Sequence, residues 1–184
     1  TYVRHLKCFL NWIKKYLDID LFTNRIIVPK SNKKVLRIYD DDDIALIFRT
    51  ISAENEWLTA RNCAIVALML DSGLRQGEVC DLLTENIYFH KAMLKVRGKG
   101  DKERIVPLGK IAMLYMKKYS ELCPFHSEYF FLSRRGEVIT RDSVKHLMWK
   151  LAQKLPFEFS SHKLRHNFAT NYCIDQYEKH GFVD

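Results

Sequence analysis

Three segments of the chain carry basic side chains that local structure does not explain. Arg75 lies at the junction of two expected helices, where a guanidinium can meet a phosphate beside a helix N-terminus. Lys99 lies between two glycines, which let a backbone come close to another molecule. His162 and Arg165 are three residues apart on an expected helix, so both can reach one anion. Each cation alone is typical of a solvated or ion-paired surface residue, but together they could stabilise charge on a phosphate.

The residues around Lys99 have the composition of a β-hairpin with a basic, glycine-rich tip. Leu94 and Val96 precede this tip, and Ile105 and Val106 follow it. We expect Leu94 and Val96 on one strand, and Ile105 on the other, to supply the apolar positions of the hairpin. Three further cations make it a finger that can enter a DNA groove: Arg97, Lys102 and Arg104.

Apolar residues recur at steps of three and four over most of the chain, which predicts a mainly helical domain. A short helix after Gly73 is expected to carry Val79, Leu82 and Leu83, and a short extended piece is expected at 129–132. The other expected helices cover 2–17, 44–51, 57–71, 110–121, 141–154 and 161 to about 178. The predicted fold class is mainly α with a small antiparallel β-sheet or hairpin (α+β).

Four consecutive aspartates, at 40–43, stand where the second of these helices begins. Negative charge suits the positive end of a helix dipole, so capping is favoured over a metal site. The five cysteines lie far apart, without the spacing of a zinc or redox pair: Cys8, Cys63, Cys80, Cys123 and Cys173. We therefore expect small, buried, reduced cysteines, no metal and no other cofactor.

The 184-residue chain is 47% hydrophobic, which is enough to bury one substantial core. Its 30 Lys and Arg against 22 Asp and Glu give a net charge of +8, which favours a polyanionic partner. No apolar run approaches the roughly 18 residues that span a bilayer, and no signal peptide opens the chain. A soluble cytoplasmic protein without a membrane partner is expected.

In order, local sequence and spacing, the three basic segments resemble those of the tyrosine recombinases, the family of phage integrases and Xer-like enzymes. The family's first arginine segment is similar to DSGLRQGEVCDLL, its β-hairpin lysine segment to VRGKGDKERIVPLG, and its His-x-x-Arg segment to SSHKLRHNFAT. Lys99 follows Arg75 by 24 residues (99 minus 75), as in the family pattern. The resemblance runs from about Val35 to the end of the chain.

The resemblance implies a division of the chain into three parts. Residues 1–26 look like the last helix of the family's preceding core-binding (SAM-like) domain, 27–38 like a polar linker, and 39–184 like the catalytic domain. Only 19 residues follow Arg165 (184 minus 165), and the family places a further His or Trp and its nucleophilic tyrosine beyond that point. We therefore expect a catalytic domain that is C-terminally incomplete.

The activity that the resemblance implies is site-specific DNA recombination through a 3′-phosphotyrosyl intermediate, with the tyrosine outside this chain. Arg75 and Arg165 would clamp the phosphate. Lys99 would protonate the leaving 5′-oxygen, and His162 would contact the phosphate and help to move the tyrosine proton. Glu78 would support the site or the helix start rather than react.

The implied partner is double-stranded DNA in the nucleoid, held by a tetramer of the full-length protein, with no metal and no other cofactor. Besides the hairpin cations, two neighbours of Arg165 are expected to bind DNA, namely Lys163 and His166. Tyr172 and Tyr177 are expected to be packing or surface residues rather than nucleophiles.

Two other functions remain open for the same fold. One is a DNA-binding regulator that has lost catalysis, which the missing tyrosine supports; the sequence encoded after Asp184 would decide. The other is a type IB topoisomerase, which shares the Arg, Lys, Arg, His and Tyr chemistry. Relaxation of DNA without a defined target sequence would indicate the topoisomerase.

Overall fold

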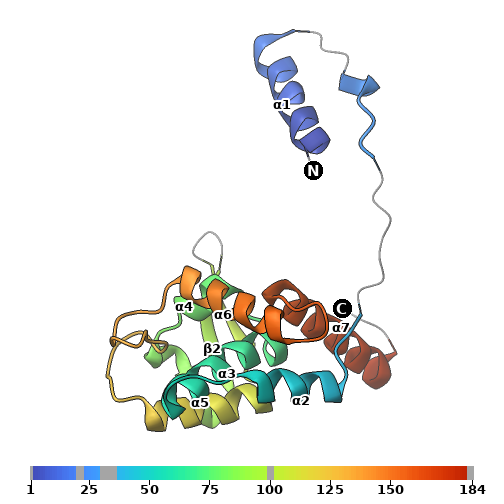
Figure 1. The fold of residues 1–184 in the computed structure, drawn as a ribbon. Coiled ribbons are helices and arrows are strands. Elements are labelled where there is room, and N and C mark those ends of the chain that lie inside the picture. Colours follow the sequence, from blue (N-terminus) through green and yellow to red (C-terminus); the bar gives the residue numbers. More distant parts are fainter. Residues whose placement is uncertain (1, 20–22, 30–36, 99–101, 182–184) are drawn as a thin grey trace. The chain divides into compact units, whose positions relative to one another are not determined.

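The computed structural model describes residues 2–19, 23–29, 37–98 and 102–181. The chain divides into two compact units, residues 1–37 and residues 38–184 (Figure 1). Lys99, at the tip of the predicted hairpin, lies outside the described residues. The second unit holds the other residues singled out above for chemistry.

The first unit contains α1 (Tyr2–Leu17) and the short 3₁₀ helix η1 (Thr23–Arg25). The range predicted for the first helix is confirmed, although none of its side chains is buried. Lys7 Nζ donates a hydrogen bond to the carbonyl oxygen of Ile26 at 3.1 Å, which ties the helix to the segment after it. Its assignment to a preceding domain stays a prediction.

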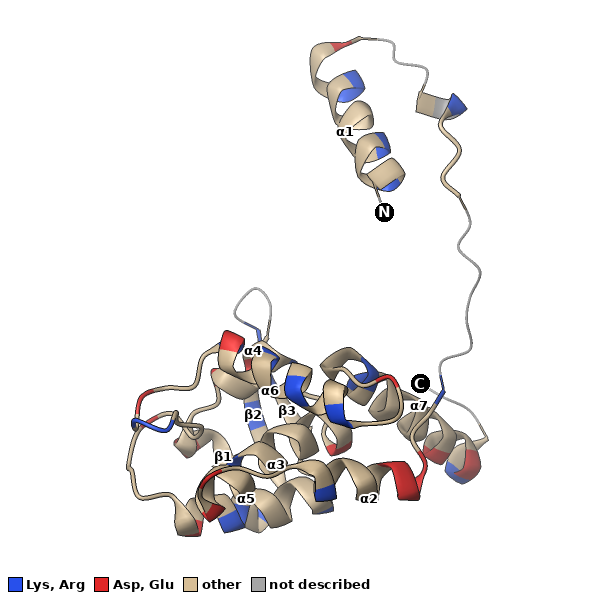
Figure 2. Ribbon diagram, viewed as in Figure 1, with Lys and Arg blue, Asp and Glu red and all other residues tan. Residues whose placement is uncertain are grey.

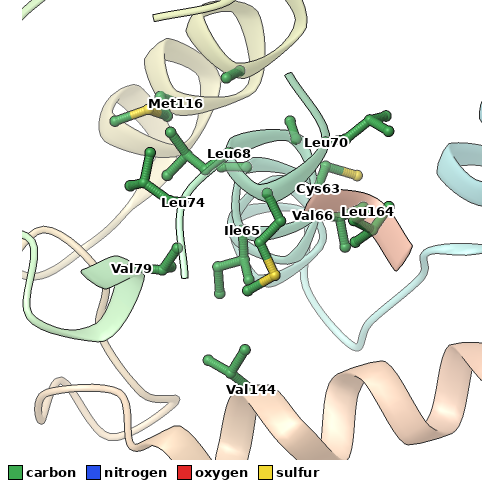
Figure 3. Packing of buried hydrophobic residues seen from close by; sticks show 14 of the residues in the cluster. Cys63, Ile65, Val66, Leu68, Leu70, Leu74, Val79, Met116, Val144 and Leu164 are labelled. Carbon is green, nitrogen blue, oxygen red and sulfur yellow. The ribbon is translucent and has the colours of Figure 1, made fainter. Parts of the chain in front are cut away.

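The core of the second unit is built around α3 (Glu56–Asp71), in which every residue from Asn62 to Leu70 is buried. A helix that is apolar on all sides has to be enclosed by other elements. Figure 3 shows Met116, Val144 and Leu164 pointing toward it. They come from the three helices α5 (Lys110–Leu122), α6 (Arg141–Lys154) and α7 (Ser161–His180). The predicted ranges of these four helices are confirmed to within about two residues.

α2 (Asp41–Thr50) begins as the aspartate run predicts. The Asp40 carboxylate accepts the backbone N–H of Asp43 at 2.8 Å, which confirms the capping interpretation. In the part of the chain that the structure describes, no group of three or more His, Cys, Asp and Glu side chains is placed to hold a metal ion. Within the same residues, no helix is long and apolar enough to cross a membrane.

The sheet has three antiparallel strands in the order β1-β2-β3, namely β1 (Ile87–Tyr88), β2 (Met93–Arg97) and β3 (Glu103–Pro107). The predicted hairpin is therefore present as β2 and β3, and the predicted fold class is confirmed. β1 was not predicted, because two residues between the 3₁₀ helices η2 (Thr84–Asn86) and η3 (Phe89–Lys91) are too short to show a period.

The face assigned to β3 was wrong. Ile105 is 56% exposed, whereas Val106 is buried at 8%. Val106 is paired with Leu94, and Arg104 with Val96, so Arg104 and Val106 share the side of the sheet that faces the core. Side chains alternate along a strand, and a shift of one residue therefore exchanges the two faces. An arginine, rather than Ile105, occupies the inward position.

α4 (Gln76–Cys80) follows a tight turn after α3. Gly73 has φ +64°, and Leu74 N–H bonds to the carbonyl oxygen of Leu68 at 3.1 Å, which ends α3. Leu82 and Leu83 were predicted on the short helix, but it ends before them. Leu83 instead pairs with Tyr129 in an isolated β-bridge, so the extended piece predicted at 129–132 supplies a partner for this segment.

The cysteine prediction holds only in part. Cys63 and Cys80 are buried and Cys123 is partly buried, but Cys8 and Cys173 are exposed. All five are free thiols in the structure. Burial raises the pKa of Cys63 and of Cys80 to about 11, so these two thiols stay protonated and unreactive near neutral pH.

Gly73→Ala is expected to lower the free energy of unfolding by about 2–5 kcal/mol. A side chain there must adopt a left-handed backbone, and its Cβ would lie 2.4 Å from Cδ1 of Phe168 on α7. Gly181→Ala is the control, because Gly181 has φ +74° but no atom of the described residues lies within 4 Å of an added Cβ. Urea unfolding checks both variants. Equal losses would show that contact with α7 does not constrain this turn.

Candidate functional site

A buried carboxylate, that of Glu78, joins two of the three basic segments. Its side chain is 5% exposed and lies on α4. Oε2 accepts the backbone N–H of Arg75 at 2.8 Å, and Oε1 accepts Nη1 of Arg75 at 2.9 Å. Arg104 donates from Nη1 to Oε1 at 2.8 Å and from Nη2 to Oε2 at 2.9 Å. Each oxygen therefore accepts two hydrogen bonds.

The contact of Glu78 with Arg75 follows from local sequence, and its contact with Arg104 follows from the pairing of β2 and β3. Glu78 is the third residue of α4, from where its side chain can return to the N–H of Arg75 just before the helix. Arg104 reaches the same carboxylate because it is opposite Val96, on the inward face of the hairpin. Figure 2 shows α4 beside the ends of β2 and β3 that lead into the hairpin tip.

The two arginines keep Glu78 ionised. Burial raises the pKa of this carboxyl, but the hydrogen bonds from Arg104 and from the backbone and side chain of Arg75 outweigh burial and leave its pKa at about 2. The hydrogen bonds to Glu78 in turn raise the pKa of Arg104. All three groups are therefore charged at neutral pH.

Arg165, on α7, supplies the third cation and has an unused donor. Its Nη1 is buried and has no hydrogen-bond partner among the described residues. Burial, the main cause, and repulsion from Arg75 and Arg104 lower the pKa of Arg165, and attraction to Glu78 opposes them. A buried charged donor without an acceptor is costly unless a further group completes it. The missing acceptor is best supplied by an anion beside Arg75, whose side chain is 61% exposed.

His162 and His166 form a pair on the exposed side of α7. Their Nε2 atoms are 2.8 Å apart and their rings are nearly perpendicular. One nitrogen must donate and the other accept, so at least one ring is neutral in this arrangement. Lys163 is 16% exposed and makes an ion pair with Glu158 at 2.5 Å. The predicted contact of Lys163 with DNA would therefore compete with its ion pair to Glu158, which the sequence did not indicate.

The remaining predicted DNA-binding residues flank the hairpin tip. Arg97 and Lys102 are exposed. The Gly98 N–H bonds to the carbonyl oxygen of Lys102 at 2.8 Å, and a Cβ at Gly98 would lie 3.3 Å from Nη1 of Arg104. The end of the hairpin next to its tip therefore packs directly against the Arg104–Glu78 pair. The catalytic role predicted for Lys99 concerns a residue outside the described part.

Sequence reasoning missed the pairing of Arg104 with Glu78. It treated Arg104 as a hairpin cation turned toward DNA, whereas both terminal nitrogens of this guanidinium contact Glu78. The available signal was the alternation of side chains along the strand, because Arg104 and Val106 are two residues apart and share one face, while Ile105 lies on the other. The choice of Ile105 as the inward residue concealed it.

The sequence model of the phage integrase family matches residues 37–180, a range that includes Arg75, Glu78, Arg104 and Arg165. The chain belongs to the phage integrase family. Among its relatives are tyrosine recombinase XerC of Rhizobium meliloti (strain 1021), 38% identical over 150 residues, and tyrosine recombinase XerA of Pyrococcus horikoshii, 28% identical over 176 residues. These alignments cover 78% and 92% of this chain, but 47% and 60% of the relatives.

Solved structures agree on the fold of this integrase-family chain. The crystal structure of XerA recombinase matches with a TM-score of 0.63 at 22% identity, covering 93% of this chain and 60% of that one. A λ integrase (75–356) dimer bound to a COC′ core site matches with a TM-score of 0.69 at 21% identity, covering 94% and 63%. The chain thus spans about half to two thirds of the length of the proteins that it matches.

Glu78→Gln is expected to remove stability that depends on pH. The pKa of Glu78 is about 2 in the folded chain against an ordinary value near 4.5, so its ionisation stabilises the fold above about pH 4.5 and this contribution disappears as pH falls toward 2. The contribution at neutral pH is about 3 kcal/mol. Wild type and variant should therefore differ most above pH 5 and converge in acid.

Urea unfolding at pH 7, 5 and 3 measures this difference. Glu54→Gln is the matched control, because Glu54 pairs with Arg134 at an exposed site, with both side chains more than 60% exposed. A difference between wild type and Glu78→Gln that stays constant from pH 7 to pH 3 would show that the buried carboxylate is not held ionised by its arginines.

Proposed function

We propose that this chain is the catalytic part of a tyrosine-type site-specific recombinase, which cuts and rejoins duplex DNA through a 3′-phosphotyrosyl intermediate. The observation that carries the proposal is the buried Nη1 of Arg165, which has no hydrogen-bond partner among the residues that the structure describes and lies within electrostatic reach of the exposed Arg75 guanidinium. A DNA phosphate supplies the acceptor that Arg165 lacks. Membership of the phage integrase family supports the same reaction class.

In this proposal the scissile phosphate binds between Arg75 and Arg165. Their guanidinium groups donate to its non-bridging oxygens, where negative charge increases as the pentacovalent state forms. Glu78 holds Arg75 through two hydrogen bonds and leaves part of that guanidinium exposed. Positions fixed before the reaction need no reorganisation during it, which is the main source of such stabilisation.

Proton transfer is assigned to two groups. His162 would contact the phosphate and help to take the proton of the attacking tyrosine, and its Nε2 contact with His166 gives that proton a second base within reach. Lys99 would protonate the leaving 5′-oxygen, since a lysine ammonium is charged at neutral pH. This chemistry can proceed without a metal ion, because arginines neutralise the charge on the phosphate.

The nucleophile is assigned to a residue outside this chain. Tyr172 and Tyr177 lie on α7 beyond Arg165 and are 50% and 65% exposed. Tyr172 stacks on Phe168, with ring centroids 6.2 Å apart, which supports a packing role. Coverage of only 47% of the XerC relative and 60% of the XerA relative is consistent with a tyrosine supplied by a longer protein.

The proposed partner is duplex DNA, held through backbone phosphates. The net charge of +8 and the exposed side chains of Arg97 and Lys102 favour such binding and predict that it weakens with salt. The λ integrase described above is a dimer on its core site, and XerH was solved bound to difH substrate. These complexes support self-association on DNA, and we further propose that the full-length protein forms a tetramer there, associated with the nucleoid in the cytoplasm.

The role of Lys99 can be isolated in a protein that includes the tyrosine, by changing the leaving group. An alkoxide needs a proton because the pKa of its conjugate acid is close to that of water and lies far above neutral pH. A thiol has a pKa of about 8.5, so a bridging 5′-sulfur hardly needs one. Lys99→Ala should slow cleavage of ordinary DNA by about 10²–10⁴-fold and recover most of that rate on the sulfur-substituted strand.

Arg75→Ala is the control. Sulfur substitution should not restore cleavage by this variant, because the negative charge on the phosphate still has to be stabilised by Arg75 when sulfur is the leaving atom. Cleavage is followed as the covalent adduct on denaturing gels. If sulfur rescues both variants equally, or neither, Lys99 is a groove-binding residue rather than the general acid. If the wild-type protein forms no adduct, the chain is a DNA-binding regulator rather than a recombinase.

A further inference from the structure

We propose that Arg104 is a positioning residue whose charge balances Glu78, so that Arg75 and Arg165 keep their positive charge for the scissile phosphate. The inference rests on the proposed function, because it needs an anion at those two arginines. In this proposal Arg104 does not bind that phosphate itself, and its two terminal nitrogens each donate to one oxygen of Glu78. It would act through the carboxylate.

The geometry that supports this role is the way in which Glu78 is shared. Oε1 accepts Nη1 of both Arg75 and Arg104, at 2.9 and 2.8 Å. Oε2 accepts the backbone N–H of Arg75 and Nη2 of Arg104, at 2.8 and 2.9 Å. Arg104 therefore takes both oxygens with its guanidinium fork, while the side chain of Arg75 takes one. The bidentate partner of Glu78 is therefore Arg104, the arginine that this proposal does not place on the phosphate.

A count of charges shows what this sharing achieves. Arg75, Arg104 and Arg165 carry three positive charges and Glu78 carries one negative charge, which leaves a net +2 (3 minus 1) around the proposed phosphate. Without Arg104 the net charge is +1 (2 minus 1), and Glu78 has Arg75 as its remaining arginine partner. The carboxylate would then neutralise the guanidinium that is meant to bind the phosphate.

Arg75, Glu78 and Arg104 lie close enough to Arg165 for a change in their net charge to act on it. The charges of Arg75, Glu78 and Arg104 all change the pKa of Arg165, so each of the three lies within electrostatic reach of it. Glu78 is 5% exposed and Arg104 is 39% exposed, so water screens their charges less than it screens a fully exposed pair. Arg104 is held there by the inward register of β3, opposite Val96.

A simpler role for Arg104 would be an ion pair that only stabilises the hairpin. The two roles differ in what restores function. If Arg104 balances charge, removal of both members of the pair returns the site to +2 (2 minus 0) and restores phosphate binding. If the pair only holds the structure, the double variant is at least as impaired as the single one.

The test is a titration of this chain with inorganic phosphate at pH 7 and low chloride, followed by NMR of the guanidinium Nε–Hε groups of Arg165 and Arg75. Arg104→Gln should weaken phosphate affinity roughly tenfold, the effect of a unit charge several ångström away in a partly screened site. Arg104→Lys keeps the charge and should stay within about threefold of wild type. Arg104→Gln combined with Glu78→Gln should recover to within about threefold as well.

Arg134→Gln is the matched control, because Arg134 also binds a glutamate, Glu54, but at a separate exposed pair. It should leave phosphate affinity at Arg165 unchanged. If wild type responds to phosphate but Arg104→Gln binds equally well, or if the double variant is the weakest, Arg104 does not balance Glu78. If the Arg165 signal of the wild type does not respond, the proposed phosphate site and the role of Arg104 both fail.

Discussion

The site depends on one interaction, the sharing of the buried Glu78 carboxylate between an arginine of α4 and an arginine of β3. An ionised carboxylate loses several kcal/mol of hydration when it is buried, and only close, well-oriented donors repay that loss. Four hydrogen bonds to two oxygens meet this requirement. Since these donors come from segments far apart in the sequence, the carboxylate fixes the distance between the start of α4 and the end of the hairpin next to its tip.

The rest of the second unit brings Arg165 to this pair. α3 lies at its centre, with α5 and α7 packed against it, and its C-terminal turn leads directly into α4. Gly73 lies in that turn against Phe168 of α7, so contact between the turn and α7 sets where Arg165 lies relative to Arg75. Burial, and then repulsion from Arg75 and Arg104, lower the pKa of Arg165, and the packing of the core holds the arginines together in spite of this repulsion.

Much of this arrangement follows from the sequence, because helix periodicity and capping are local properties. The ranges of α1, α3, α5, α6 and α7 were predicted from spacing, and the Asp40 cap from the aspartate run. The residues that converge on Glu78 were also singled out, because their segments have distinctive local sequences. The direction in which each side chain points was harder to predict, since β3 offers Ile105 and Val106 as adjacent apolar candidates for one inward position. Only the register with β2 decides between them, and pairing of distant strands is not a local property.

The central claim is that Arg165 Nη1 and Arg75 together hold one DNA phosphate. The most direct measurement is a crystal structure of this chain bound to a short DNA duplex. We expect a backbone phosphate with one oxygen within hydrogen-bond distance of Arg165 Nη1, another oxygen contacting the Arg75 guanidinium, and Arg104 still paired with Glu78. A bound duplex that leaves Arg165 Nη1 without an acceptor, or that places Arg104 rather than Arg75 on the phosphate, would contradict that claim.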